Sequence, residues 1–472
     1  MKFADDFVFG TATASYQVEG AHDEGGRTPS IWDTQCRTPG KIKNGDTGDV
    51  ACDQYHRWPE DLEIIKGLGL GAYRFSISWS RVLPQGLGEP NPEGIAYYRE
   101  LCRSLKQAGI SPVVTLYHWD LPQVLEDRGG WTVRETAYAF ADYARLMARE
   151  LGDLVDVWST LNEPWCSSYL GYASGVHAPG RTEPLAALQA VHHLNLAHGL
   201  AARALREELG DEVPVCLTLN LHVTHPLTDS AEDIAAARKI DVVGNEAFLM
   251  PVMEGVLSPE LVEITREVTD WGFVQEGDLE LCHQVPDILG VNYYSTSTVK
   301  ARQEGEASTS GGHGETGVSP WVACDDVVFL PPEGPLTAMG WNQEPDALRR
   351  LLVQVSRRYP GQELMVTENG AAFSDEVSSD GQVHDPDRVA YLRQHLTAVA
   401  QAVEEGAQVT GYFLWSLLDN FEWSWGYQKR FGMVRVDYET LERTPKDSAK
   451  WYADLARSRD LDTVGEDWVA GA

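Results

Sequence analysis

Short apolar runs alternate with longer amphipathic stretches along the whole chain. Eight of the runs are rich in Val, Ile, Leu or aromatic residues and have the length of buried strands. They span residues 7–10, 72–76, 111–116, 155–160, 214–219, 288–291, 364–367 and 410–414. Helical patterns between them include residues 94–107, 133–151 and 185–208. The alternation predicts an α/β fold, a single (β/α)8 TIM barrel, in preference to an open doubly wound sheet.

Polar or aromatic side chains end or follow almost every predicted strand. They are Gln17, Arg74, His118, Trp119, Asn162, Glu163, Asn220, Asn292, Tyr294, Glu368 and Trp415. In a (β/α)8 barrel the C-terminal ends of the strands meet at one rim, where active sites lie. We therefore expect these residues to surround one active site, although they are spread over most of the sequence.

Two of these residues are carboxylates. Glu163 lies in TLNEP (160–164) and Glu368 lies in TENG (367–370). A single glutamate after a strand is usually a helix-cap partner or part of a salt bridge, but a pair on the fourth and seventh strands favours chemistry. Cleavage of a glycosidic bond needs one carboxyl group that donates a proton and a second that is ionised. Arg74 is a candidate for the cation that keeps one of them ionised.

Aromatic residues are abundant, with 15 Trp, 18 Tyr and 12 Phe. Several lie in or beside the strand-end segments, among them Trp119, Trp341, Trp415 and Trp423. Indole faces can stack on the apolar faces of sugar rings, while Gln, His, Asn and Glu bind hydroxyl groups. The alternative is that the Trp side chains fill space between barrel and helices. The mixture with polar residues favours a carbohydrate pocket.

Charge and missing motifs exclude other classes. The formal net charge is -33, from 38 Lys+Arg and 71 Asp+Glu, so we expect no nucleic-acid partner and no membrane partner. HExxH, a GxGxxG after the first strand, GxxxxGK[ST] and GxSxG are absent, so we expect no metal and no cofactor. The seven Cys have no CxxC spacing, which indicates reduced thiols and a cytoplasmic location.

Several longer motifs occur together and in order: FVFGTATASYQVEG (7–20), YRFSISWSRVLPQG (73–86), TLYHWDLPQ (115–123), TLNEP, GVNYY (290–294), VTENG (366–370) and LWSLLDNFEWSWGYQKRFGMVRVD (414–437). With these motifs the chain resembles the family-1 glycoside hydrolases, the β-glucosidase family, from about residue 7 to residue 452. The resemblance implies that Glu163 is the acid/base and Glu368 the nucleophile.

The resemblance also implies the roles of the remaining site residues. Gln17, His118, Asn162, Glu422 and Trp423 match residues that bind the hydroxyl groups of the glycone, and Trp415 matches the platform beneath its ring. Arg74 and Tyr294 match hydrogen-bond partners of the nucleophile, and Asn292 matches a polar neighbour of the acid/base. Trp119, Asn220 and Trp341 complete the predicted substrate-binding set, with Trp341 on the aglycone side.

The implied activity is that of a retaining β-glycosidase. It would remove terminal non-reducing β-D-glucosyl residues, or galactosyl or fucosyl residues, from β-glucosides and cello-oligosaccharides. A 6-phospho-β-glycosidase and a non-catalytic sugar-binding barrel are the alternatives. Glu422 would repel a phosphate, although Lys429 and Arg430 lie nearby, and sugar-binding barrels typically lack one carboxylate. Glycone and aglycone preference, chain length, transglycosylation and a homo-oligomeric state stay open.

We expect residues 1–472 to form one domain. Residues 303–320 (QEGEASTSGGHGETGVSP) are rich in Gly and Ser and have no apolar period, so they predict a flexible loop. Such a loop is either part of the rim of the site or a tolerated surface insertion.

Overall fold

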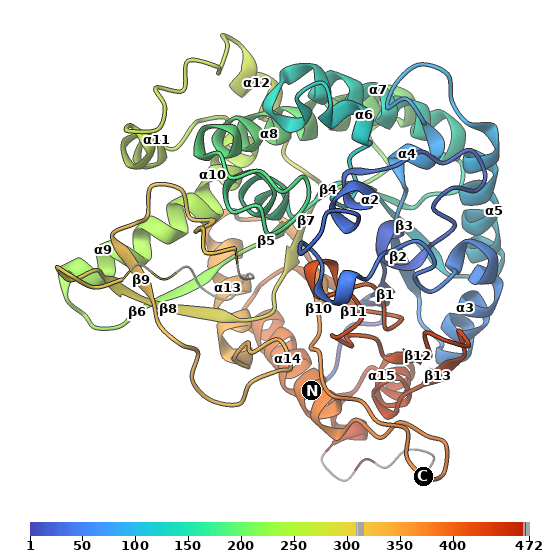
Figure 1. Ribbon diagram of the computed structural model, residues 1–472. Helices are drawn as coiled ribbons and strands as arrows, with labels where there is room; N and C mark the ends of the chain where they lie inside the picture. Colours follow the sequence, from blue (N-terminus) through green and yellow to red (C-terminus); the bar gives the residue numbers. More distant parts are fainter. Residues whose placement is uncertain (308, 310–315, 466–467, 469–472) are drawn as a thin grey trace.

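A closed barrel of eight parallel strands forms the centre of the computed structural model, which describes residues 1–307, 309, 316–465 and 468 (Figure 1). The strands are β1 (Val8–Ala12), β2 (Ala72–Ser76), β3 (Ser111–Tyr117), β4 (Val157–Asn162), β5 (Val215–Asn220), β7 (Ile288–Asn292), β10 (Glu363–Asn369) and β11 (Val409–Trp415). β1 pairs with both β2 and β11, which closes the barrel. The predicted barrel is therefore confirmed, and the open sheet is wrong.

All eight predicted strands coincide with barrel strands, but most observed strands run one or two residues further at the C-terminal end. β4 continues to Asn162, β5 to Asn220, β7 to Asn292 and β10 to Asn369. The apolar runs stop earlier because the last residues of these strands have polar side chains, which lie at the rim of the barrel. The backbone ladder continues through these polar residues, since it depends on backbone groups rather than on hydrophobicity.

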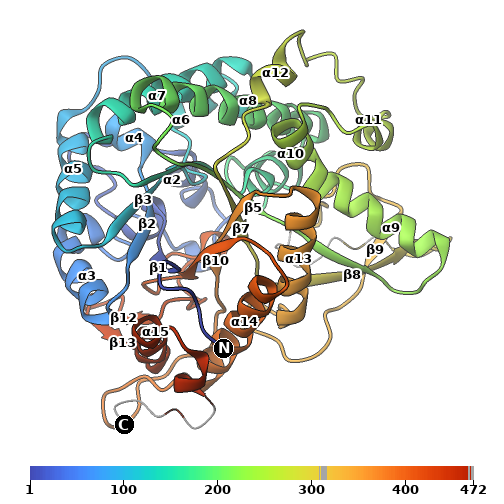
Figure 2. The same cartoon turned by 180° about the vertical axis from the view of Figure 1, so that it is seen from behind.

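Helices surround the barrel, as Figure 2 shows from behind. The longer ones are α3 (Gln54–Leu68), α5 (Pro92–Gln107), α7 (Arg134–Leu151), α8 (Pro184–Leu209), α13 (Pro345–Arg358), α14 (Pro386–Glu404) and α15 (Asp447–Ser458). The shorter ones are α1 (Ser15–Val18), α2 (Ile31–Cys36), α4 (Trp79–Val82), α6 (Gln123–Glu126), α9 (Ala231–Asp241), α10 (Ala247–Leu249), α11 (Pro259–Thr265) and α12 (Asp278–Cys282). In α5, Asn91 caps the N-terminus and Pro92 occupies the first turn, while the apolar stripe packs inwards.

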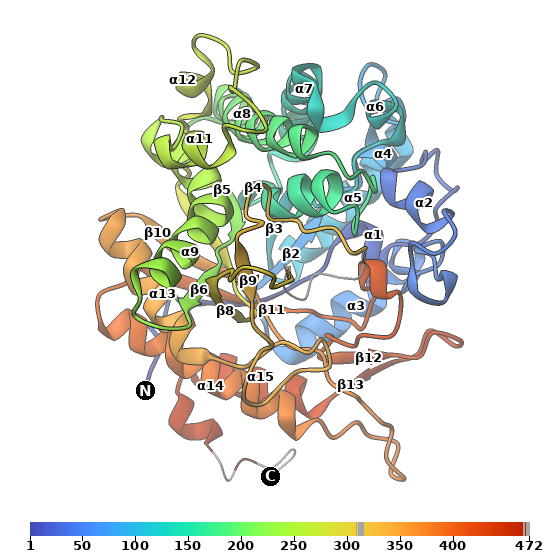
Figure 3. The same cartoon turned by 60° about the vertical axis from the view of Figure 1, so that its left-hand side comes forward.

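Two small sheets were not predicted. β6 (Val223–Pro226), β8 (Thr296–Ala301) and β9 (Val327–Phe329) form one beside α9, which comes forward in Figure 3. β12 (Val434–Val436) pairs with β13 (Arg443–Pro445) in the other. Of the predicted loop 303–320, residues 308 and 310–315 lie outside the described residues. Within its described part, the Thr316 hydroxyl donates to the Ser174 carbonyl.

Backbone irregularities coincide with the carboxyl ends of the strands. The pairing of β10 with β7 shifts register between Val366 and Glu368, and that of β4 with β5 shifts between Ser159 and Asn162. Glu163 has a φ of 47° and Trp423 a φ of 50°, in the left-handed region that side chains other than Gly rarely adopt. Such bulges and strained residues re-aim side chains and concentrate at functional sites.

A buried ionic cluster lies beneath the segment that follows β11. The Lys446 ammonium contacts Asp375 at 2.5 Å and Asp419 at 2.8 Å, and the Lys446 side chain is fully buried. Arg430 also pairs with Asp419, at 2.6 Å. These pairs join the β11–β12 connection to the start of α15. No helix among the described residues is long and apolar enough to span a bilayer.

Candidate active site

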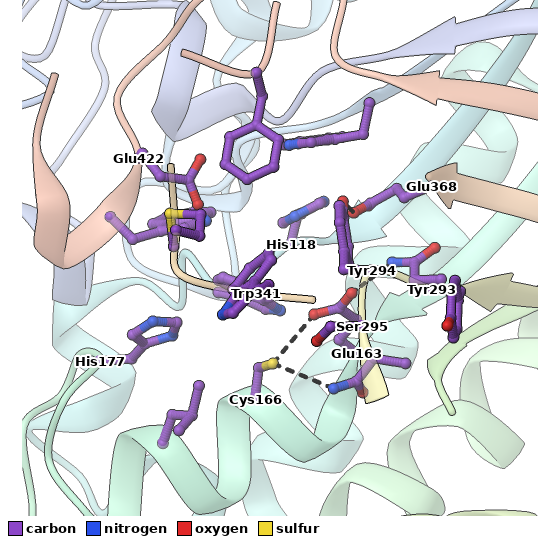
Figure 4. A pocket seen from close by; sticks show the side chains of 18 of the residues that line it. His118, Glu163, Cys166, His177, Tyr293, Tyr294, Ser295, Trp341, Glu368 and Glu422 are labelled. Carbon is purple, nitrogen blue, oxygen red and sulfur yellow. Dashed lines mark hydrogen bonds between the residues drawn. The ribbon is translucent and has the colours of Figure 1, made fainter. Parts of the chain in front are cut away.

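A solvent-open cavity of about 970 Å³ lies at the carboxyl ends of the barrel strands (Figure 4). Eleven of the predicted site residues line it: His118, Trp119, Glu163, Asn220, Asn292, Tyr294, Trp341, Glu368, Trp415, Glu422 and Trp423. They come from β3, β4, β5, β7, β10 and β11 or from the connections that follow these strands. Barrel closure therefore gathers residues that are far apart in the sequence.

Glu163 follows the last residue of β4 and is 5% exposed. One carboxyl oxygen, Oε1, accepts a hydrogen bond from Asn292 Nδ2 at 2.7 Å. The other, Oε2, lies 3.1 Å from the Cys166 thiol, which can donate to it. Hydrogen-bonding groups thus contact both oxygens, but no cation does within the described structure.

Glu368, on β10, is 3% exposed and has different partners. Arg74 donates to Oε1 at 2.6 Å, and the Tyr294 hydroxyl donates to Oε2 at 2.7 Å. The Arg74 side chain is itself only 1% exposed, so its charge is little screened by water. A buried guanidinium and a phenol together stabilise the ionised form of this carboxylate.

The two carboxyl groups influence each other. Burial and the charge of Glu368 raise the pKa of Glu163 to about 8. Burial also raises the pKa of Glu368, but the Arg74 charge and the hydrogen bonds from Arg74 and Tyr294 oppose that rise. The negative charge of the pair therefore resides on Glu368, while Glu163 holds a proton at neutral pH. One cavity thus contains an acid and an ionised carboxylate.

Three predicted residues lie directly behind the cavity wall. Arg74 bridges Glu368 and Asn162, since its second nitrogen donates to Asn162 Oδ1 at 2.6 Å. Asn162 Nδ2 in turn contacts His118 Nε2 at 3.1 Å. Gln17 donates to the Phe421 carbonyl at 2.9 Å and reaches Glu422 Oε2 at 3.4 Å. These side chains fix the orientation of the residues that face the cavity.

His118 Nδ1 and Gln17 Oε1 are among the buried polar atoms that have no partner within the described structure. Because Asn162 Nδ2 donates to His118 Nε2, the proton of the neutral imidazole is on Nδ1, which is left as a donor. Burial and the Arg74 charge lower the pKa of His118 well below its usual range, so the ring stays neutral. A free donor and a free acceptor next to the cavity suit ligand hydroxyl groups.

Aromatic side chains form the walls. The His118 ring lies nearly parallel to Trp415 and Trp423, with centroids 5.7 and 6.0 Å away. Trp119 packs against Trp423 at 4.6 Å, and its indole N–H donates to the Asn162 carbonyl. Trp341 packs on Tyr294 at 5.6 Å. Indole faces beside hydroxyl-binding groups are the surroundings that a sugar ring requires.

Glu422 is a third carboxyl group in the cavity. Burial and the charges of Glu368 and Glu163 raise its pKa to about 8. Gln17 Nε2 donates a hydrogen bond to its Oε2 at 3.4 Å. Since it is largely uncharged near neutral pH, it can donate as well as accept hydrogen bonds, which suits a neutral polyol ligand.

Some cavity residues lie outside the predicted catalytic and substrate-binding set. They are Cys166, Leu170, His177, Leu221, His222, Tyr293, Ser295, Met339, Trp425 and Phe431. Cys166 and Leu170 lie on η3 (Cys166–Ala173), a π-helical segment after β4, and the others mostly on loops. The position of Cys166 three residues after Glu163 was the one available signal, because a helix starting there places it beneath that carboxyl group.

The described residues contain no group of three or more His, Cys, Asp and Glu side chains arranged to hold a metal ion. The cavity contains an acid, an ionised carboxylate and aromatic walls. Two carboxyl groups with opposite surroundings at the rim of a (β/α)8 barrel define a glycoside hydrolase.

Comparison with known proteins agrees with this class. The family model described as Glycosyl hydrolase family 1 matches residues 1–461, and the chain belongs to this family. A bifunctional β-D-glucosidase/β-D-fucosidase of Bifidobacterium breve is 52% identical over 466 residues, covering 96% of this chain and 97% of the relative. β-Glucosidase A of Thermotoga maritima is 43% identical over 462 residues, covering 98% and 99%. The resemblance found in the sequence is thereby confirmed.

Solved structures give the same result. The psychrophilic β-glucosidase BglU from Micrococcus antarcticus has a TM-score of 0.94 and 46% identity, covering 97% of this chain and 98% of its own. The family 1 β-glucosidase from Thermotoga maritima in complex with isofagomine lactam has a TM-score of 0.90 and 42% identity, covering 97% and 99%. The similarity covers nearly the whole chain.

Proposed function

We propose that this protein is a retaining β-glucosidase that removes terminal non-reducing β-D-glucosyl residues from β-glucosides and cello-oligosaccharides. β-D-Fucosides are further candidates, since the relative from Bifidobacterium breve is described as a glucosidase and a fucosidase. The observation that carries the proposal is the pair Glu163 and Glu368, which share one cavity but have opposite electrostatic surroundings.

In the first step, Glu368 attacks the anomeric carbon while Glu163 protonates the departing oxygen. The C–O bond to the aglycone breaks, and an ester between the sugar and Glu368 forms. Arg74 and Tyr294 hold the nucleophile, so that one carboxyl oxygen points at the sugar. As the ester forms, Glu368 loses its charge, which removes the main reason why Glu163 was protonated.

In the second step, Glu163 acts as a base. It now lacks its proton, takes one from a water molecule, and the water oxygen attacks the anomeric carbon. The ester bond to Glu368 breaks and the sugar leaves with its original configuration. The cycle restores the charge of Glu368 and therefore the raised pKa of Glu163.

Substrate recognition follows from the unpaired atoms and the aromatic walls. Gln17 Oε1 accepts from, and His118 Nδ1 donates to, neighbouring hydroxyl groups of the glycone. Glu422, which lies beside Gln17, binds further hydroxyl groups of the same ring, and Trp415 and Trp423 contact its apolar face. The aglycone extends towards Trp341 and Asn220.

A neutral glycone is favoured over a 6-phosphorylated one. Lys429 donates to the Ala338 carbonyl at 2.5 Å and lies 4.7 Å from the Trp425 ring, while Arg430 is paired with Asp419. Both nearby cations thus already have partners, and Glu422 offers no positive charge to a phosphate. A non-catalytic role is disfavoured because both carboxyl groups are in place.

We further propose that residues 1–472 form one catalytic domain that acts in the cytoplasm. All seven cysteines are free and buried, which fits a reducing compartment. Every residue named for the two steps belongs to one chain, so a homo-oligomer is not required for turnover.

A panel of nitrophenyl β-glycosides, with the first-released anomer identified by NMR, tests the activity and its stereochemistry. We expect the β-anomer first and no cleavage of 6-phosphorylated glycosides. Glu368→Ala should abolish turnover, and azide should restore cleavage with an α-glycosyl azide as product. Release of the α-anomer by the wild-type enzyme, or a β-glycosyl azide from the variant, would refute the assignment.

A further inference from the structure

The hydrogen-bond directions around Glu163 are determined by Arg74, whose guanidinium can only donate. Arg74 donates to Asn162 Oδ1 at 2.6 Å, so this atom is an acceptor. The Asn292 atom 3.1 Å from the same oxygen must then be the donor Nδ2. Asn292 Oδ1 accordingly accepts from the Thr367 hydroxyl at 2.7 Å. The Asn292 amide therefore has one orientation.

This orientation decides which oxygen of Glu163 carries the proton. Asn292 Nδ2 donates to Oε1 at 2.7 Å, and a second hydrogen cannot occupy the space between these atoms. The proton of neutral Glu163 is consequently on Oε2. Oε2 lies 3.1 Å from the Cys166 sulfur, the contact drawn between these two residues in Figure 4.

Cys166 is suited to contact an oxygen that changes its protonation state. Its thiol can donate one hydrogen bond and accept others. Burial and the neighbouring Glu163 raise the pKa of the Cys166 thiol well above its usual range, so the sulfur keeps its hydrogen. Asn220 Nδ2 also donates to the sulfur, at 3.5 Å, and limits its movement.

We propose that Cys166 is a positioning residue for the proton transfer, holding Glu163 Oε2 in both states of the catalytic cycle. This inference rests on the proposed function. When Glu163 is protonated, the Oε2 hydrogen goes to the glycosidic oxygen and the sulfur lies alongside. When Glu163 is ionised, the S–H group donates to Oε2 and stabilises the carboxylate that will activate water. The thiol hydrogen stays on sulfur throughout, and no bond to sulfur forms or breaks.

Other charged groups also act on Glu163. Glu368 on β10 and Glu422 after β11 disfavour its ionisation, whereas Arg74 on β2 favours it. Tyr294 faces the same carboxyl groups, and His177 and His222 line the same cavity. None of these side chains changes when Cys166 alone is replaced. A change in the apparent pKa of the acid/base can then be assigned to the thiol, whose hydrogen bond lowers the pKa of Glu163.

The test compares Cys166→Val, which removes the donor, with Cys166→Ser, which keeps one. The measurement is kcat/KM against pH for a phenyl β-glucoside, whose poor leaving group requires the acid. We expect the basic limb of this pH profile to lie about 0.5–1 unit higher in pH for the Val variant than for wild type. The change is small because a thiol is a weak donor to a charged acceptor. The Ser variant should not show this rise.

Cys102→Val is the matched control, because Cys102 is also fully buried but lies on α5, outside the cavity. The basic limb of its kcat/KM profile should lie at the same pH as in the wild type. An unmoved limb in Cys166→Val, or an equal rise in Cys166→Ser, would overturn the role of the thiol. Should the Val variant not fold, Cys166→Ala is used, with the protonated carboxyl band of Glu163 followed by infrared difference spectroscopy. That band should then persist to higher pH, and an unchanged titration overturns the inference.

The two proposals fail in different ways. A wild-type enzyme that cleaves no β-glycoside would refute the proposed function. An active wild-type enzyme whose basic limb is insensitive to the thiol would refute only the inference on Cys166.

Discussion

The hydrogen bond from Tyr294 to Glu368 gives the sharpest test of the electrostatics of the site. Tyr294→Phe removes one oxygen, the one that donates to Glu368 Oε2 at 2.7 Å. The ring keeps its neighbours Trp341 and Phe431, whose centroids lie 5.6 and 6.0 Å away. The substitution therefore changes the surroundings of the nucleophile and leaves the shape of the cavity nearly unchanged.

The size of the effect follows from the charge of the acceptor. A hydrogen bond to a charged group contributes about 1.5–3 kcal/mol, and one pKa unit corresponds to about 1.4 kcal/mol. The bond stabilises ionised Glu368, so its loss raises the pKa of Glu368 by about 1–2 units. Because Glu368 must be ionised to attack, the acidic limb of kcat/KM should move to higher pH by the same amount.

The assay is kcat/KM for a nitrophenyl β-glucoside from acidic to alkaline pH. Tyr293→Phe is the matched control, since the Tyr293 hydroxyl donates to the Glu344 carbonyl at 2.6 Å and not to a carboxylate of the site. Its acidic limb should stay in place. An unmoved acidic limb in a well-folded Tyr294→Phe variant would show that the phenol does not stabilise the ionised nucleophile.

Three further predictions concern stability. Glu163→Gln should unfold at a higher temperature than wild type in calorimetry, and this difference should grow as pH rises from about 4 towards 8. Folding raises the pKa of Glu163 to about 8, so the wild-type protein loses folding free energy over that pH range, whereas the uncharged Gln does not titrate. An advantage that shrinks with pH would contradict this sign. Lys446→Met should lower the urea-derived free energy of unfolding by about 3 kcal/mol, because Asp375 and Asp419 each lose one of two cations and keep only Arg388 and Arg430, whereas the exposed Lys66→Met control should cost under about 1 kcal/mol. Equal losses in the two variants would refute it. Sodium chloride should raise the melting temperature, since it screens the self-repulsion of a net charge of -33; a fall would show that surface ion pairs outweigh that repulsion.

The barrel could be predicted from the sequence because its strands are buried on both faces. Runs such as 288–291 and 364–367 contain almost nothing but apolar residues, which is typical of parallel strands. The strands of the β6–β8–β9 sheet could not be found in this way. β6 (VTHP) and β8 (TSTVKA) are mostly half-buried and carry little apolar signal. Their pairing depends on neighbours that lie far away in the sequence.

The cavity was predictable where a residue ends a strand, since barrel closure alone decides where it lies. Glu163, Asn292 and Glu368 are of this kind. Cys166, His177 and His222 are not, because their positions depend on the path of the chain after β4 and β5. The hydrogen-bond directions were also out of reach. They follow from contacts such as Arg74 with Asn162, which no spacing along the chain predicts.

The pairing of β1 with β11 has a consequence for biosynthesis. Gln17 contacts Phe421 and Glu422, so the glycone side of the cavity joins residues that are translated 404 or more positions apart. A nascent chain that has released every barrel strand except β11 still lacks Trp415 and Glu422. The cavity can thus be completed only after β11 and the segment that follows it have been translated, and until then the edges of β1 and β10 need protection from other chains.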